Sequence, residues 1–255
     1  AAVQSLAGLD IQGAATQAVA LFTDKQLEKA DARTTLKAVL GRDGGAEALA
    51  GALQTTPLDA EAARRLLEAL FSTGRSDAPL ISILGQAIGT ARNAPEYDQG
   101  YVKKLAAGAG QDGKADRGAL IFKAMACASC HRISGSGGGV GPDLTALGTT
   151  LSAERIVEEL LWPSRQVKEG YTVLQVLTTG GKIYQGYERR TKESQQKGEL
   201  VIQDVSSGKL ITFAEGEVEE KRAAGSAMPA GLTSLLSAEQ LQDLVRYLTG
   251  LGKIE

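Results

Sequence analysis

The sequence of 255 residues is poor in the side chains that most metal and redox chemistry uses. It holds one His, two Cys, two Met and one Trp, and only 4% of its residues are aromatic. A mechanism that needs two imidazoles from one chain is therefore excluded. No apolar run approaches the roughly 20 residues of a membrane span. The formal net charge of −2 disfavours strong attraction to nucleic acid or anionic lipid, so we expect neither as a partner.

What is present suits a folded chain of more than one part. Hydrophobic residues make up 43% of the sequence, which is enough for real cores, and glycine is abundant at 31 residues. The length exceeds the usual size of one domain and predicts two or three small ones. The chain starts at Ala1 without Met, and we expect that an export signal has been removed.

The scarce residues are concentrated at one place, Cys127-Ala-Ser-Cys130-His131. This is the C-x-x-C-H pattern of c-type haem attachment. Two thiols three positions apart can each add to a vinyl group on one porphyrin edge, and the next residue offers its imidazole to the iron. A dithiol redox site is disfavoured because a helical pattern precedes the cysteines. A zinc site normally needs a fourth ligand, which the motif does not supply. We predict one covalent haem c on Cys127, Cys130 and His131.

The other side of the iron has few possible protein ligands. A second His does not exist, and Met125 lies only two residues before Cys127, on the same side of the ring. Met228 remains, followed by Pro229, which stiffens the backbone, and by Gly231, which permits a tight turn. The alternative is that Met228 fills a gap in a core. We predict His131 and Met228 as the two axial ligands, a pair that raises the reduction potential.

The segments around these residues resemble class I cytochromes c. Met228-Pro229 is followed by Asp-Leu-Val-Arg-Tyr-Leu at 243–248, and Gly118-x-x-x-Phe122 precedes the haem motif. The resemblance implies that Gly118 and Phe122 cross Leu244 and Tyr247 where the first and last helices of the domain pack. Ser237 and Gln240 form a predicted capping box at the start of the last helix.

The same resemblance implies roles for the glycine-rich loop that follows the haem motif. The carbonyl of Pro142 is expected to accept the Nδ1–H of His131, which fixes the ring. Leu144 is expected to cover the porphyrin. A helix from about Ser152 ends at Trp162, which is either a wall of the haem site or an anchor of the core; both readings stay open.

An insertion of about 170–222 separates this helix from Met228. Its composition predicts strands at 171–178, 183–190, 200–205, 210–214 and 217–222, with a polar stretch at 192–198. Weak alternation along the strands predicts that one face packs on the cytochrome core while the other meets water.

Four groups of residues in and around this insertion resemble the haem-binding domain of the planctomycete/verrucomicrobial type. They are Gly141-Pro-Asp-Leu144, Pro163-Ser164, Gly170-Tyr171 and Ser226-Ala-Met-Pro-Ala-Gly-Leu232. The resemblance covers about 113–250. Members of that family are often the tail of larger dehydrogenase-type proteins, so this chain is expected to be a candidate electron-accepting module; no propeller domain is visible in it.

The first hundred residues are rich in Ala and Leu. Apolar stripes predict helices at 14–22, 27–40, 46–53 and 80–88, and another between Asp59 and Gly74. Helices of this length joined by short turns suggest HEAT-like repeats. Residues 1–6 read like the middle of such a repeat, so we expect a fragment or processed product of a longer protein. The fold class is therefore mainly α, with a helical domain at 1–107, a linker at 108–114 and a cytochrome c domain at 108–255.

These predictions together favour a one-electron carrier that is not itself an enzyme. It would serve a redox partner, a dehydrogenase or another cytochrome, and its location would be periplasmic or otherwise exported, because the resemblance implies attachment of haem c outside the cytoplasm. Two alternatives remain: a haem enzyme or gas sensor with a displaceable Met228, and a protein-binding scaffold in which the haem only staples the fold. The missing distal His counts against a peroxidase.

Overall fold

The computed structural model describes residues 2–24, 26–75, 77–89 and 96–253. Over these residues the chain is mainly α, about 51% helical, with a small antiparallel sheet. Its contacts divide it into two compact units. The first comprises Ala1–Ala91 and Lys168–Ala227, and the second Arg92–Val167 and Met228–Glu255. The chain therefore leaves the second unit and returns to it, and each unit is described separately below.

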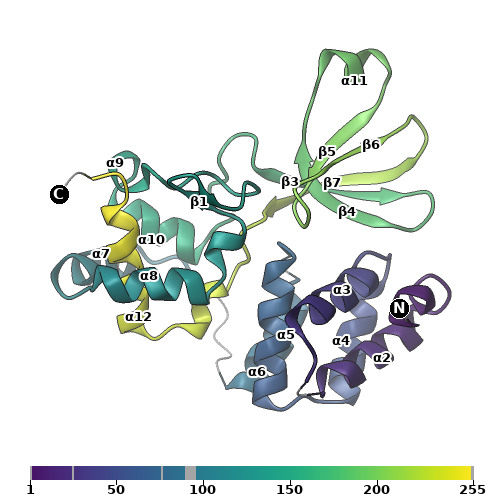
Figure 1. The fold of residues 1–255 in the computed structure, drawn as a ribbon, viewed down its shortest axis with the longest axis horizontal. Helices are drawn as coiled ribbons and strands as arrows, with labels where there is room; N and C mark the ends of the chain where they lie inside the picture. The colour runs from purple at the N-terminus through teal and green to yellow at the C-terminus, as the bar shows by residue number, and fades with distance from the viewer. Residues whose placement is uncertain (1, 25, 76, 90–95, 254–255) are drawn as a thin grey trace. The chain divides into compact units, whose positions relative to one another are not determined.

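The first unit begins with a set of amphipathic helices (Figure 1). They are α1 (Ala2–Leu6), α2 (Ile11–Phe22), α3 (Lys29–Leu40), α4 (Gly45–Thr55), α5 (Ala60–Ser72) and α6 (Ala78–Ile88). Helix α2 packs on α4, and α5 packs on both α3 and α6. The carboxylate of Asp59 caps α5 by accepting the Ala62 N–H at 2.8 Å. The five helices expected from the sequence are confirmed, and α1 is an addition to them.

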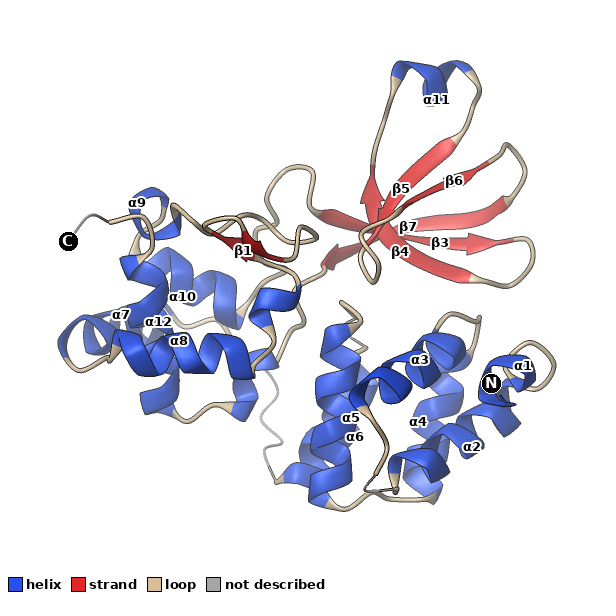
Figure 2. Cartoon of the chain, viewed as in Figure 1, coloured by secondary structure: helices blue, strands red, loops and turns tan. Residues whose placement is uncertain are grey.

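The rest of the first unit is a five-stranded antiparallel sheet (Figure 2). Its strands are β3 (Thr172–Thr178), β4 (Ile183–Glu188), β5 (Leu200–Asp204), β6 (Leu210–Phe213) and β7 (Val218–Ser226), in the spatial order β6-β5-β4-β3-β7. The expected strands are confirmed, but β7 is longer than predicted and returns to pair with β3. The polar stretch at 192–198 forms the short helix α11 (Lys192–Gln196), because Thr191 and Ser194 make a capping box.

The sheet is joined to the N-terminal helices by backbone and side-chain bonds. Ile183 N–H donates to Gly41 O at 2.9 Å, and Asp43 N–H donates to Gly181 O at 3.1 Å. The carbonyl of Ser206 accepts from the guanidinium of Arg33 and from Lys37 Nζ. Burial and the neighbouring Arg33 lower the pKa of Lys37. These contacts explain why the sheet and the helices form one unit.

The division by contacts differs from the expected one at two places. The sheet was expected to pack on the cytochrome core, whereas the contacts group its strands with the N-terminal helices. Alternation along a strand specifies that a face is buried, but not which element covers it. The expected boundary at 107/108 also falls inside helix α7 (Gln99–Gln111), which belongs to the second unit. Only Asp112, Gly113 and Lys114 separate α7 from the next helix.

The second unit is a cluster of helices around one apolar core. Besides α7 it contains α8 (Ala115–Ala124), α9 (Leu147–Thr150), α10 (Ala153–Leu161) and α12 (Ala238–Gly250). The buried core includes Val102, Val157, Leu161, Leu244 and Val245. Ser152 caps α10, and Ser237 with Gln240 forms the predicted capping box of α12, so both expected helix starts are confirmed.

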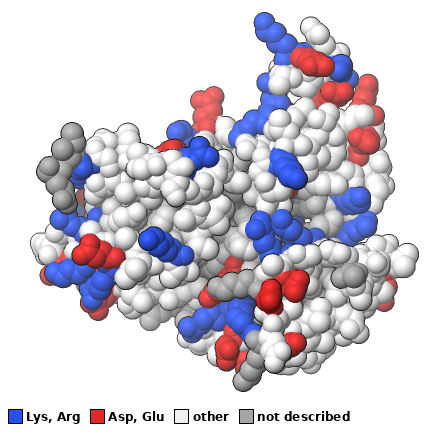
Figure 3. Space-filling view, in the orientation of Figure 1, with Lys and Arg blue, Asp and Glu red and all other residues white. Residues whose placement is uncertain are grey.

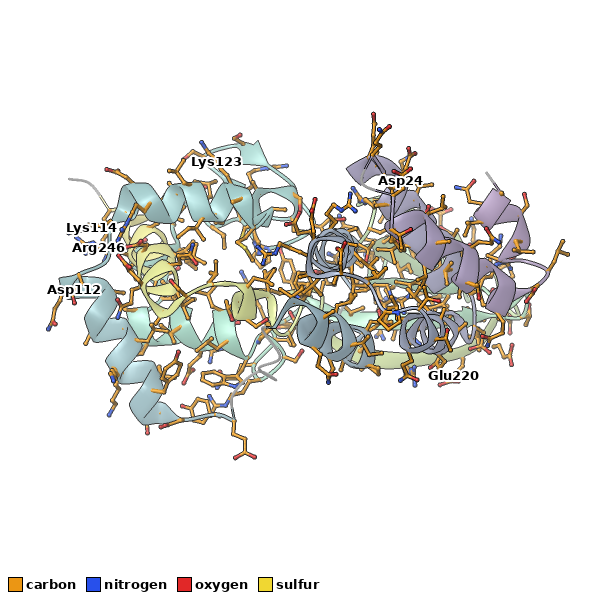
Figure 4. All side chains as sticks on the ribbon, turned by 90° about the horizontal axis from the view of Figure 1, so that it is seen from below. Asp24, Asp112, Lys114, Lys123, Glu220 and Arg246 are labelled. Carbon is orange, nitrogen blue, oxygen red and sulfur yellow. The ribbon has the colours of Figure 1, made fainter. Side chains whose placement is uncertain are left out.

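The crossing of α8 and α12 is as close as Gly118 predicted. A Cβ at Gly118 would overlap the carbonyl oxygen of Asp243 and approach Tyr247 Cβ to 2.6 Å. The rings of Phe122 and Tyr247 lie 5.7 Å apart. The buried carboxylate of Asp243 accepts the N–H of Lys114 at 2.7 Å, at the start of α8, where Figure 4 labels Lys114. A backbone donor at one helix end is thus satisfied by the other helix.

Candidate haem site

The two cysteines and the histidine lie on one tight turn after α8. Ala126 has a φ of 55°, which reverses the chain into the short 3₁₀ helix η1 (Cys127–Ser129). The carbonyl of Cys127 then accepts the N–H of Cys130 at 3.2 Å and that of His131 at 3.0 Å. The cysteines form no disulfide. The local hydrogen bonds therefore hold both thiols and the imidazole on one compact segment.

Cys127 differs from Cys130 in its surroundings. Its side chain packs against the apolar core of the second unit. Burial raises the pKa of the Cys127 thiol to about 11. The unmodified thiol is therefore neutral at physiological pH. Cys130 Sγ lies near the Ser129 hydroxyl, at 3.7 Å.

His131 is oriented by the residue that the family resemblance indicated. Its Nδ1 lies 2.9 Å from the carbonyl oxygen of Pro142, so the expected contact is present. Because a carbonyl oxygen only accepts, Nδ1 carries the proton and Nε2 keeps the lone pair that a metal would use. Burial lowers the pKa of His131, which favours the neutral imidazole. Pro142 thus fixes both the ring and its tautomer.

The glycine-rich loop fits tightly under this turn. A Cβ at Gly141 would lie 2.7 Å from Cε1 and 2.8 Å from Nδ1 of His131. A Cβ at Gly137 would overlap the His131 carbonyl oxygen, and one at Gly138 would overlap that of Ser129. These glycines were expected only as a loop around the haem edge. In the sequence, the repeated glycines of this loop are the only signal that three of its positions lie very close to other atoms of the backbone or the imidazole.

The far end of the loop is tied back to the same turn. Leu144 N–H donates to Arg132 O at 2.8 Å, and Ser134 N–H donates to Thr145 Oγ1 at 2.7 Å. The side chain of Leu144 packs against the core of the second unit, as the side chain of Cys127 does. Leu144 is therefore held near the haem motif by a backbone bond.

Met228 is the second unit's first residue after the sheet. It is half-buried and packs against the same core as Cys127 and Leu144. Pro229 is buried beside it, and Gly231, with a φ of 82°, starts the 3₁₀ helix η2 (Leu232–Leu235). The chain thus brings a thioether to this core from about a hundred residues further along the sequence.

Trp162 also packs against this core. It contacts a cluster of side chains that the sequence did not predict. The ring of Tyr97 lies 5.2 Å from that of Trp162, and the guanidinium of Arg165 stacks on Tyr97 at 3.6 Å. The Tyr97 hydroxyl donates to Glu158 at 2.8 Å, which raises the pKa of Tyr97 and lowers that of Glu158. This cluster ties the start of the second unit to α10.

The surface and the metal-binding groups limit the alternatives. On the face shown in Figure 3, basic and acidic groups are scattered over a mostly uncharged surface. Over the described residues, no three His, Cys, Asp or Glu side chains come together as a metal-holding group. No helix in the described part of the chain combines the length and apolar character needed to cross a membrane.

The residues present fit a haem c group. Two thiols on one turn can take the two thioether bonds, and an imidazole fixed through Nδ1 can bind iron through Nε2. The family described as Cytochrome c matches residues 115–174, from the start of α8 into β3. This match supports a c-type cytochrome with covalent haem, an electron carrier in general terms. A search of curated proteins finds no match to this chain.

Proposed function

We propose that this protein is a monohaem c-type cytochrome that transfers single electrons. The haem would be bound covalently to Cys127 and Cys130, with His131 and Met228 as axial ligands. One observation carries the proposal: His131 is oriented by Pro142 on the same turn as the two thiols, and Met228 packs against the same core as Cys127. The family match to residues 115–174 supports it independently.

Each residue has a separate task in this proposal. Cys127 and Cys130 fix the porphyrin edge, and His131 supplies Nε2 while Pro142 keeps Nδ1 protonated. Leu144 excludes water from the ring, and Met228 contributes a thioether that favours ferrous iron. When bound, the haem supplies a centre that cycles between ferrous and ferric states. With both axial positions taken by protein side chains, no open position would remain for a substrate, which suits a carrier better than an enzyme.

The wider setting also belongs to the proposal. The order of motifs from Gly141 to Leu232 supports the planctomycete/verrucomicrobial type, and the paired packing of α2 to α6 is compatible with HEAT-like repeats. We propose an exported or periplasmic location, one haem per chain, and a dehydrogenase or another cytochrome as redox partner, within a larger protein or beside one. Cytochrome c domains are typically exported or periplasmic, and the family in general interacts with redox partners, which supports this part of the proposal.

The test is the visible spectrum of the holoprotein and of Met228→Ala. We expect low-spin haem c with the weak far-red band of an Fe–S bond, and slow binding of CO to the ferrous form. Met228→Ala should lose the band and lower the potential by on the order of 0.1 V or more, within the roughly 0.8 V that axial ligands span. Met125→Ala is the matched control and should keep both. An unchanged spectrum in Met228→Ala would remove Met228 from the site, and rapid CO binding by the unaltered protein would favour the enzyme or sensor.

A further inference from the structure

We infer that Trp162 forms part of the wall of the haem site and that Tyr97, just ahead of α7, is its positioning residue. The inference rests on the proposed attachment of haem to Cys127 and Cys130. It adds to that site a residue from outside the segment that matches the cytochrome family. All the residues concerned belong to the second unit.

Helix α7 is an addition to the part of the chain that matches the family. The match begins at residue 115, whereas α7 ends at Gln111. Helix α7 nevertheless packs on α10 and α12, and its Val102 and Leu105 are buried in the core of the second unit (Figure 2). The second unit is therefore larger than the matched segment, and the residues just before α7 bring a further side chain, Tyr97, to the end of α10.

Trp162 stands directly after α10, whose apolar face lies in this core. Its indole packs against the core, as the side chains of Cys127, Leu144 and Met228 do. All four residues are only partly buried, so each keeps a surface that a bound porphyrin would cover. A large apolar ring in this position suits a wall of the haem site better than an anchor inside the core.

Tyr97 holds Trp162 through an edge-to-face contact. The two ring centroids lie 5.2 Å apart, and the ring planes meet at 69°. Tyr97 is itself fixed at two other places, because its hydroxyl donates to Glu158 at 2.8 Å and the guanidinium of Arg165 lies 3.6 Å from its ring centroid. Arg165 also donates to Glu158, at 3.3 Å. This closed network fixes the orientation of Tyr97 and, with it, one side of the indole.

The size of the effect follows from the aromatic contact. An edge-to-face pair shifts a conformational equilibrium by roughly two- to tenfold. Without Tyr97, the indole of Trp162 should leave its place more often by this factor, and water should reach the haem instead. Ferric iron carries one more positive charge than ferrous iron, so water stabilises the ferric form and the equilibrium constant for reduction falls.

The experiment measures the reduction potential and the circular dichroism of the Soret band on the full-length holoprotein. Tyr97→Ala should lower the equilibrium constant for reduction by about two- to tenfold. It should also change the Soret dichroism, which reports aromatic rings beside a porphyrin. Tyr97→Phe keeps a ring against Trp162 and should restore most of both signals. Trp162→Leu should shift both signals at least as far as Tyr97→Ala does.

Tyr101→Ala is the matched control. Tyr101 lies on α7, four positions after Tyr97, and the two residues are equally exposed, at 38% and 39%. This control should leave the potential and the Soret dichroism unchanged. The free energy of unfolding of each holoprotein is measured as well. A Tyr97 that only stabilised the fold would lower this free energy on substitution and leave the potential and the dichroism as they are, which contradicts the inference.

The results that overturn the inference differ from those that overturn the proposed function. Unchanged potential and dichroism in Trp162→Leu would remove Trp162 from the haem site. A shift in Trp162→Leu with none in Tyr97→Ala would mean that Tyr97 does not position it. If Trp162→Leu does not fold, the comparison of Tyr97→Ala with Tyr97→Phe decides. An unaltered protein without the far-red band refutes ligation by Met228 alone, because the variants report on any attached haem, whereas a protein that takes up no covalent haem refutes both.

Discussion

Gly141 shows how one residue without a side chain can control the orientation of His131. The imidazole of His131 occupies the space that a Cβ at position 141 would need, and the adjacent Pro142 supplies the carbonyl that orients the ring. The site is thus made by two neighbouring residues of a loop that is otherwise exposed over much of its length. Close approach is possible because glycine is present where the ring lies flat against backbone.

The first prediction concerns this contact. Gly141→Ala should push the imidazole away from Pro142 O and destabilise the holoprotein by about 1–3 kcal/mol, the usual range for overpacking. The measurement is guanidinium unfolding of the purified holoprotein, together with its visible spectrum. Gly139→Ala is the control, because a Cβ there would meet only the flexible end of Arg132 at 3.3 Å. Equal stability of the two variants would contradict the packing described for His131.

At the scale of elements, the packing of α8 on α12 positions the turn that carries Cys127, Cys130 and His131, called the haem turn below. The helix that carries Gly118 ends at Ala124, three residues before Cys127, so its position decides where the thiols lie. Asp243 on α12 accepts the Lys114 N–H and pairs with Arg117, which fixes the other end of α8. Both contacts hold the start of α8, so a small shift there would displace the whole helix.

The second prediction tests the closeness of this crossing. Gly118→Ala should lower the free energy of unfolding by about 1–3 kcal/mol or more, because the added methyl group overlaps the Asp243 carbonyl. Gly110→Ala on α7 is the matched control, since nothing lies within 4 Å of the Cβ it would gain. That control should be neutral or more stable by about 0.5–1 kcal/mol. Denaturant titration of both holoproteins gives the comparison.

The third prediction concerns Asp243, which is 2% exposed. Asp243→Ala removes the acceptor of the part-buried Lys114 N–H and a buried ion-pair partner of Arg117, and should cost about 1–3 kcal/mol. Glu239→Ala removes the other acidic partner of Arg117, but that side chain is 69% exposed. Exposed pairs contribute about 0–1 kcal/mol, so this control should change little. A large loss for Glu239→Ala with none for Asp243→Ala would reverse the assignment.

At the scale of the whole molecule, each of the two compact units is built from two separate stretches of the chain. The sheet, inserted in sequence between α10 and Met228, is bonded to the N-terminal helices, and α8, which precedes the haem turn, packs on α12, the helix that follows the sheet. Neither unit is complete from one continuous stretch. The stability of the N-terminal helices should therefore depend on residues about 130 to 200 positions away along the chain.

The fourth prediction tests this dependence. Replacing 172–226 by a short Gly-Ser linker removes the partners of Gly41, Asp43, Arg33 and Lys37. Each lost bond costs about 0.5–1.5 kcal/mol, so α3 and α5 should become more susceptible to limited proteolysis. The unaltered holoprotein is the reference. Unchanged cleavage of 1–91 would mean that the helices form an independent domain, as the sequence had suggested.

The sequence was sufficient where the signal is local. The C-x-x-C-H pattern, the caps at Asp59, Ser152 and Ser237, and the strands of the insertion are each specified by residues a few positions apart, and the structure has them. Helix α7 was missed because its sequence, Gln-Gly-Tyr-Val-Lys-Lys-Leu-Ala-Ala-Gly-Ala-Gly-Gln, contains three glycines that favour a linker. Its apolar residues become helical because they fill the core beside α12.

The tertiary structure alone decided which elements share a core. Alternation and amphipathicity fix that a face must be buried, but they are equally satisfied by any apolar partner. The sheet therefore forms one unit with the N-terminal helices, which are bonded to it through Gly41 O and through the carbonyl of Ser206. Met228 packs against the core that also holds Cys127 and Leu144. Five consecutive residues, 127–131, determine the chemistry of the motif. The placement of its expected sixth ligand depends on packing between segments far apart in the chain, which no local pattern encodes.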